Sequence, residues 1–384
     1  MKLIDTLPEV FESFNEQRKN SFITALQMKE QGIPFVGVFC TYLPQEIPMA
    51  MGAAVVGLCS MSGETIPDAE KDLPRNLCPL IKSSYGFAKT DKCPFFYFSD
   101  LIVGETTCDG KKKMYEYLAE FKPVYVMELP NSQSSDALEL WKKEVIRFKE
   151  KLEQHFGTVI TEEQVRQAVR LKNAERAALR DFYSLMKLNP APMLGQDLYK
   201  VLYGSTFKFD KEALIKEMQE LTAKVRAEYD PQNSPLKGRP RVLVTGSPIG
   251  GVTEKVIRAL EDNGAQVVVF ENCSGAKSID EDVDADAADI YDALARRYLN
   301  IGCSCMTPNP NRIRLMNRLI DEYQVDAVVE VILQACHTYN VESLGIRRFV
   351  TGEKKLPYIS VETDYSTSDT GQLNTRMAAF VEMI

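Results

Sequence analysis

The sequence predicts an α/β protein with two Rossmann-like domains, each built on a parallel sheet, joined by a helical segment. Short apolar runs rich in β-branched residues alternate with helical patterns in both halves of the chain. These runs are apolar throughout, as expected for strands that helices cover on both faces. Between the halves lies a stretch rich in Lys, Glu, Ala, Leu and Arg that contains no strand-like run.

The predicted strands fall into two sets of four. They are residues 33–39, 53–58, 95–103 and 124–129, followed by 241–245, 266–270, 327–333 and 358–361. In the second half, helical patterns follow the strands at 251–263, 290–299, 312–323, 342–351 and 372–383. Such helices are the crossovers that connect parallel strands.

The middle of the chain is predicted to be a helical connector. Its apolar residues recur with helical spacing, for example at Val165, Val169 and Leu179. Prolines interrupt it near 189–192, and a segment rich in Pro, Asn and Gly at 230–238 leads into the second half. We therefore expect an N-terminal α/β domain at 1–133, the connector at 134–237 and a C-terminal α/β domain at 238–384.

Charge and hydropathy exclude several classes of function. The net charge is −8 and the isoelectric point about 5.2, whereas a nucleic-acid-binding protein needs an excess of Lys and Arg. The one basic run, Lys111–Lys113, is interpreted as a solvated helix start. The chain has no apolar run of about 18 residues and no signal-peptide pattern at its N-terminus. We expect a cytoplasmic protein that binds neither nucleic acid nor membrane.

The chain has nine cysteines. Thiols do not persist as structural disulfides in a reducing cytosol, so this number suggests metal binding or redox chemistry. Cys59 and Cys93 are interpreted as small buried apolar residues. The six candidate ligands lie at loops or strand–helix junctions, and they are Cys78, Cys108, Cys273, Cys303, Cys305 and Cys336.

The position of these cysteines favours metal ligation. A helix N-terminus favours thiolate over thiol, and thiolates are the ligands of iron–sulfur clusters. Cys108 and Cys336 each follow a predicted strand, so two facing domains would bring them together at the carboxyl ends of their sheets. A zinc site made of four cysteines, or of cysteines with His337, is the alternative. The chain has neither a ferredoxin pattern nor a C-x-x-C knuckle, and we favour iron–sulfur over zinc.

A glycine-rich loop, GSPIGG at 246–251, follows a predicted strand and begins a helix. Its spacing differs from G-x-G-x-x-G, and Pro248 occupies the part of the loop that would approach a dinucleotide. We interpret these residues as turn glycines.

Several cysteine-bearing segments resemble the 2-hydroxyacyl-CoA dehydratase superfamily. They are FCTYLPQE (39–46), DLPRNLCPL (72–80), GETTCDGKKKMY (104–115) and QACHTY (334–339). Two further segments, ENCSGAK (271–277) and GCSC (302–305), are similar to the double-cubane cluster proteins within that superfamily. The likeness extends over essentially the whole chain.

The resemblance implies a ligand set. Members of the superfamily hold one 4Fe–4S cubane with three cysteines, which correspond to Cys78, Cys108 and Cys336. In the double-cubane branch a bridging sulfide joins a second cubane to the first, giving an 8Fe–9S cluster. This cubane needs three more cysteines, and Cys273, Cys303 and Cys305 are available. Cys40 could replace Cys303 or Cys305, but we interpret it as a buried thiol beneath the cluster. Ser247 stands where some relatives have a cysteine.

The resemblance also implies an activity. Branch proteins are typically homodimers that reduce small molecules, with electrons supplied at low potential by a partner ATPase that carries its own iron–sulfur cluster. We therefore expect an ATP-driven iron–sulfur reductase component. The alternatives are an (R)-2-hydroxyacyl-CoA dehydratase subunit with a single 4Fe–4S cluster and a non-catalytic electron carrier. A reductase must also deliver protons. His337, whose unperturbed pKa is near neutrality, and Glu46 are the predicted catalytic donors, with Glu105 as a third candidate.

Overall fold

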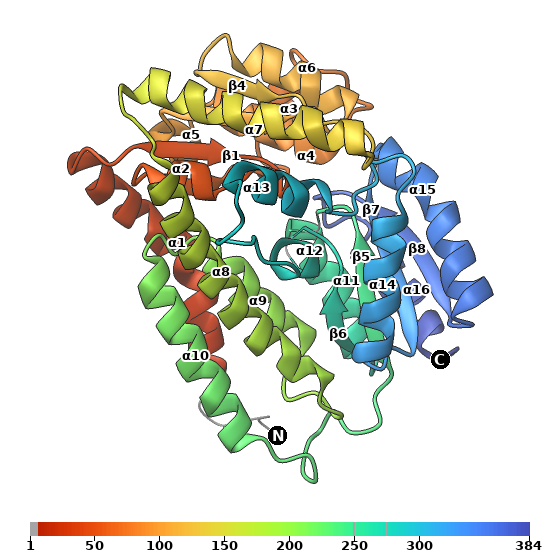
Figure 1. The fold of residues 1–384 in the computed structure, drawn as a ribbon. Helices are drawn as coiled ribbons and strands as arrows, with labels where there is room; N and C mark the ends of the chain where they lie inside the picture. Colours follow the sequence, from red (N-terminus) through yellow and green to blue (C-terminus); the bar gives the residue numbers. More distant parts are fainter. Residues whose placement is uncertain (1–6, 249, 274) are drawn as a thin grey trace.

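The computed structural model describes residues 7–384 except 249 and 274. Its N-terminal sheet contains β1 (Phe35–Val38), β2 (Ala54–Gly57), β3 (Leu101–Glu105) and β4 (Val124–Met127). All pairs are parallel, in the order β2-β1-β3-β4. Figure 1 shows this sheet and its helices in red to yellow, and the second sheet, in teal and blue, lies separate from it.

The C-terminal sheet repeats the same topology. It contains β5 (Arg241–Gly246), β6 (Gln266–Phe270), β7 (Ala327–Leu333) and β8 (Tyr358–Thr363), all parallel and in the order β6-β5-β7-β8. Every residue of β5, β6 and β7 is buried, as their continuous apolar sequences predict. The predicted fold of two Rossmann-like parallel-sheet domains is confirmed.

The expected strand at 95–103 is wrong in its first half. Residues Pro94–Phe98 form a short helix, α5, and strand β3 begins only at Leu101. Pro94 occupies the first helical turn, where its fixed φ favours a helix and its missing N–H costs nothing. This local signal outweighs the aromatic, strand-like composition of the segment.

Helices cover both sheets and fill the space between them. The N-terminal part contains α1 (Leu7–Glu30), α2 (Glu46–Ala50), α3 (Ile66–Ala69), α4 (Pro79–Lys89) and α6 (Asp109–Leu118). The predicted connector range contains α7 (Ser135–Phe156), α8 (Glu162–Ser184), α9 (Gly195–Ser205) and α10 (Lys211–Glu228). The C-terminal part contains α11 (Gly250–Asp262), α12 (Ala276–Ile279), α13 (Ile290–Leu299), α14 (Pro310–Glu322), α15 (His337–Arg347), a π-helical turn (Arg348–Glu353) and α16 (Thr370–Val381). Within the described residues, no helix has the length and apolar composition needed to cross a bilayer.

Within the 246–251 segment, Gly246 behaves as a turn glycine, whereas Gly250 and Gly251 belong to α11 and residue 249 lies outside the described residues. The φ of Gly246 is +114°, and a Cβ at this position would lie 2.0 Å from the carbonyl oxygen of Val331. Only glycine fits a backbone that turns so closely against the neighbouring strand.

Helix α13 comes from the second half of the sequence but packs in the core of the first domain. Leu294 and Tyr298 belong to the same buried cluster as Val36 and Val103 of the N-terminal sheet and Trp141 of α7. In Figure 1, α13 accordingly lies next to the N-terminal helices. This crossing carries the chain that follows α13 to the boundary between the two domains.

A buried ion pair holds α13 in place. The Arg176 guanidinium of α8 lies 2.6 Å from a Glu46 carboxylate oxygen and donates a 2.9 Å hydrogen bond to the Tyr298 hydroxyl. Tyr298 in turn donates to the other oxygen of Glu46 at 2.7 Å. Burial raises the pKa of Glu46, but the attraction of Arg176 and the Tyr298 hydrogen bond outweigh it, so the pKa lies below its ordinary value. Three helices, α2, α8 and α13, are thereby joined.

We predict that Arg176→Leu destabilises the protein by about 3–5 kcal/mol, because it leaves the Glu46 carboxylate buried without its cation. The free energy of unfolding, measured by urea titration, tests this. The matched control is Arg226→Leu, which breaks an ion pair with Asp181 whose side chains are 53% and 51% exposed. This control should cost no more than about 1 kcal/mol. Equal losses in the two variants would contradict the prediction.

Candidate functional site

Cysteines follow the carboxyl ends of strands in both sheets. Cys40 lies after β1 and Cys108 after β3, while Cys273 lies after β6 and Cys336 after β7. In open parallel sheets this edge is where ligands bind. The structure brings these strand ends from the two domains together, and the cysteines form two groups there.

The first cysteine group consists of Cys78, Cys108 and Cys336. Each occupies the N-cap position of a helix, namely α4, α6 and α15. Negative charge on Cys336 raises the pKa of both Cys78 and Cys108, and negative charge on Cys108 raises the pKa of Cys78. The three thiols therefore lie close together. The positive ends of three helix dipoles are therefore directed at one small region.

Burial dominates the acidity of Cys78 and Cys108. It raises the pKa of the Cys78 thiol to about 12 and that of Cys108 above its ordinary value. The backbone N–H groups of Leu80 and Ile81 oppose this at Cys78 and those of Gly110 and Lys111 at Cys108, without reversing it. A bound metal would reverse the balance, because a coordinated thiol loses its proton.

The second cysteine group consists of Cys40, Cys273, Cys303 and Cys305. Thr41 donates to the Cys273 sulfur at 3.7 Å. Burial raises the pKa of Cys40 far above its ordinary value, and Glu105, Cys273 and Cys303 add to this effect. The structure therefore brings Cys40, which the sequence left ambiguous, together with the three cysteines of the ENCSGAK and GCSC segments.

Close packing fixes the loop that carries Cys303 and Cys305. A Cβ on Gly302 would lie 2.3 Å from the backbone nitrogen of Arg312, so only glycine permits this approach to α14. The Asn309 side chain donates to the Cys303 carbonyl at 2.9 Å, and the Tyr42 hydroxyl donates to the Ile301 carbonyl at 2.8 Å. The loop is thus held from both domains.

Cys303 differs from the other cysteines in its acidity. A hydrogen bond from the Cys305 thiol lowers the pKa of Cys303 well below its ordinary value, and Lys277 and Tyr339 contribute in the same direction despite burial. The same hydrogen bond, together with burial, raises the pKa of Cys305. Of the two thiols, Cys303 therefore gives up its proton more readily.

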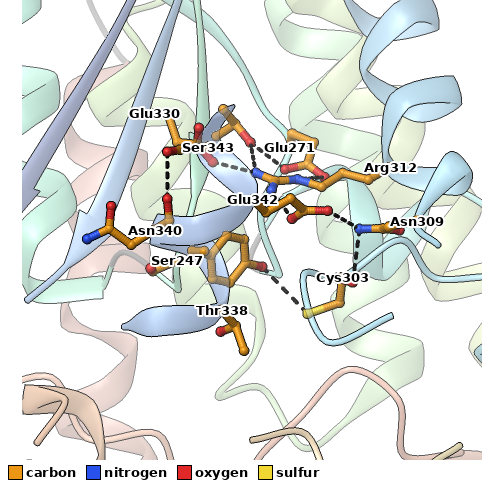
Figure 2. Close-up of polar contacts among 12 residues, drawn as sticks. Ser247, Glu271, Cys303, Asn309, Arg312, Glu330, Thr338, Asn340, Glu342 and Ser343 are labelled. Carbon is orange, nitrogen blue, oxygen red and sulfur yellow. Dashed lines mark hydrogen bonds and ion pairs between the residues drawn. The ribbon is translucent and has the colours of Figure 1, made fainter. Parts of the chain in front are cut away.

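A buried network of charged residues lies behind the second group. The Arg312 guanidinium contacts Glu330 at 3.0 Å, Glu342 at 2.5 Å and Glu271 at 3.5 Å. Figure 2 shows Arg312 between these carboxylates, with Cys303 nearby. Lys277 lies 3.0 Å from Glu271, and both side chains are fully buried. No sequence pattern predicts this network, although Glu271 is the first and Lys277 the last residue of the ENCSGAK segment.

The interpretation of Lys111 as a solvated residue is wrong. Its side chain is only 8% exposed and its ammonium lies 5.5 Å from the centre of the Phe39 ring, while Lys112 and Lys113 are exposed. The charge of Lys111 lowers the pKa of both Cys108 and Cys273. It is a buried cation within reach of both cysteine groups.

The three candidate proton donors occupy different environments. His337 is exposed at the first residue of α15, directly after Cys336. Glu46 is the buried, ionised partner of Arg176 described above, an arrangement that favours a structural role. Neither carboxylate oxygen of Glu105 has a hydrogen-bond partner on another described residue, and burial raises its pKa to about 7.

The described residues contain no group of three or more His, Cys, Asp or Glu side chains arranged to hold a single metal ion. A structural zinc site requires four ligands around one ion. In an iron–sulfur cluster the cysteines bind different iron atoms, so its ligands need not converge on one point. The donor set fits such a group: thiols from both domains, helix N-termini and two buried lysines.

We predict that the stability difference between Glu105→Gln and wild type depends on pH. Glu105 keeps its proton to about pH 7 when folded but loses it near pH 4.3 when unfolded. The native state therefore binds more protons between these values, and this contribution to wild-type stability falls as pH rises. The metal-free variant should gain up to about 3 kcal/mol relative to wild type between pH 4.5 and 8, measured by urea unfolding.

Glu116→Gln, on an exposed residue of α6, is the matched control for removal of one negative charge. A difference between Glu105→Gln and wild type that stays constant from pH 4.5 to 8 would contradict the prediction.

Comparison with known proteins places this chain in a family. The model of the 2-hydroxyglutaryl-CoA dehydratase D-component matches residues 40–384. The chain is 60% identical, over the full length of both proteins, to YjiM of Escherichia coli K12, which carries the provisional name of a dehydratase subunit. It is 22% identical to the (R)-phenyllactyl-CoA dehydratase beta subunit of Clostridium sporogenes, with 93% of each chain covered. It is also 22% identical to a benzoyl-CoA reductase subunit of Thauera aromatica, over 80% of this chain and 76% of that protein. This chain belongs to the 2-hydroxyglutaryl-CoA dehydratase D-component family.

Proposed function

We propose that this protein is the iron–sulfur reductase component of an ATP-driven system that reduces small molecules at low potential. Cys78, Cys108 and Cys336 would hold one half of an 8Fe–9S double cubane, and Cys273, Cys303 and Cys305 the other half. The observation that carries the proposal is the second cysteine group, because a single 4Fe–4S centre has no need of it. The proposal includes a homodimer and an iron–sulfur ATPase as the electron donor.

The charges around the cysteines support an anionic occupant. Three helix N-termini are directed at the first group. The buried ammonium of Lys111 lowers the pKa of a cysteine in each group, and that of Lys277 lowers the pKa of Cys273 in the second group. Buried cations are costly unless they meet negative charge. A bound cluster would supply electrons at low potential, tuned by its net charge and by hydrogen bonds to its sulfurs.

His337 is the residue we propose for proton delivery. It is exposed, so it can exchange protons with solvent, and it follows a proposed ligand directly. Glu105, buried beside Lys111 and Cys40, is suited to hold a proton inside the protein rather than to pass one to substrate. Glu46 remains the ionised partner of Arg176 and positions α2 and α13.

A dehydratase subunit is the second candidate function. The family model and the phenyllactyl-CoA relative are named as dehydratases, while the benzoyl-CoA relative is named as a reductase. A dehydratase subunit would need only the first cysteine group. In that case the substrate would be a 2-hydroxyacyl-CoA instead of the small molecule that we propose, and the enzyme would need an additional subunit.

We expect protein purified without oxygen to contain about eight iron atoms per chain, twice the content of one 4Fe–4S centre. The double variant Cys303→Ser/Cys305→Ser should retain about four, because the first group is unchanged. Iron and acid-labile sulfide analysis measures both values. Cys93→Ser, at a cysteine outside both groups, is the control and should retain the wild-type content. Stoichiometric zinc without iron in the wild type would contradict the proposal.

Turnover separates the two candidate functions. A reductase should reduce a small unsaturated substrate such as acetylene only when ATP and the partner ATPase are both present, and without any coenzyme A thioester. Product formation under anaerobic conditions, with each component omitted in turn, tests this. Dehydration of a 2-hydroxyacyl-CoA by the protein and its activator would instead favour the dehydratase. Electron uptake without turnover of either substrate would favour an electron carrier.

A further inference from the structure

Two buried side chains, Lys277 and Tyr339, face the second cysteine group. Lys277 is on α12 and Tyr339 on α15, and the Lys277 ammonium lies 3.3 Å from the Tyr339 hydroxyl. That hydroxyl lies 3.7 Å from the Cys303 sulfur. The pair thus forms a continuous contact from a buried cation to a cysteine sulfur.

The charged network behind the pair holds it in one arrangement. Glu271 contacts the Lys277 ammonium at 3.0 Å, and the Arg312 guanidinium stacks 4.9 Å from the centre of the Tyr339 ring. Arg312 is itself fixed by Glu330 and by Glu342. The network therefore fixes the positions of the ammonium and the hydroxyl, and it also reaches the Cys303 backbone, because the Asn309 side chain donates to both Glu342 and the Cys303 carbonyl.

Lys277 is the cation of the network that lies toward the second cysteine group, through its hydrogen bond to the Tyr339 hydroxyl beside Cys303. Glu271 is shared between Lys277 and Arg312, so neither cation has this carboxylate to itself. The Lys277 ammonium donates a hydrogen bond to the Tyr339 hydroxyl and forms an ion pair with Glu271. Cys273 and Cys303 both respond to the charge of Lys277.

We propose that Lys277 and Tyr339 are positioning residues that stabilise negative charge on the Cys303 sulfur and thereby raise the reduction potential of the cluster held there. This inference rests on the proposed function. Hydrogen bonds to cluster sulfurs and nearby positive charge favour the reduced, more negative state. The half of the cluster at the second group then accepts an electron more readily than its buried position alone would allow.

Tyr339→Phe tests the inference with the least disturbance, because it removes the hydroxyl and keeps the ring that stacks on Arg312. The anaerobic iron-loaded variant should keep the iron content of the wild type. Its midpoint potential, determined by redox titration followed by electron paramagnetic resonance, should shift to a more negative value. Tyr358→Phe is the matched control. It removes a hydroxyl that donates to Glu330 of the same network at 2.6 Å, and it should leave the potential unchanged.

Lys277→Met should shift the potential further in the same direction, and Lys277→Arg, which keeps the positive charge, should shift it less than Lys277→Met. If Lys277→Met fails to fold, the comparison of Tyr339→Phe with Tyr358→Phe still decides. Iron-loaded Tyr339→Phe with the wild-type potential would overturn this inference alone. Wild-type protein that takes up no iron would instead overturn the proposed function.

Discussion

The structure depends on one topological constraint: each sheet has the same parallel strand order, and the carboxyl ends of both sheets lie at a common boundary. Parallel strands deliver the residues that follow them to a single edge. Cysteines from distant segments, such as Cys108 after β3 and Cys336 after β7, become neighbours for this reason. Helix α13 packs in the first domain, and the chain that follows it returns to this boundary with Cys303 and Cys305.

The sequence predicts the sheets well because their strands are buried on both faces. Strands β6 and β7 have the predicted bounds, since an apolar run between turn residues has few other structures available. The junction positions of Cys78, Cys108 and Cys336 follow from the same reasoning. The roles of Lys111 and Lys277 do not, because a lysine is normally exposed and only tertiary packing decides that one is buried. The partners of Cys40 likewise depend on how the two domains meet.

Cys303 differs electrostatically from the cysteines around it. Burial keeps Cys78 and Cys108 protonated, whereas the Cys305 thiol, Lys277 and Tyr339 favour a thiolate at Cys303. A metal that binds Cys78 or Cys108, or Cys273 or Cys305 of the second group, must displace a proton from a thiol whose pKa is raised, so its affinity depends on pH. Cys303 gives up its proton more readily than these thiols. The network around Arg312 thus acts as a fixed counter-charge within the fold, which no single cysteine motif provides.

The position of α13 also has a consequence for biogenesis. Cys40, Cys78 and Cys108 leave the ribosome early, but Cys273, Cys303, Cys305 and Cys336 emerge only near the end of synthesis. Each group combines cysteines from both portions, and the loop after α13 must dock on a domain that was made first. The second group is complete only after Cys305 has been made and the first only after Cys336. Under the proposed function, iron and sulfide would therefore be inserted late in synthesis or after it.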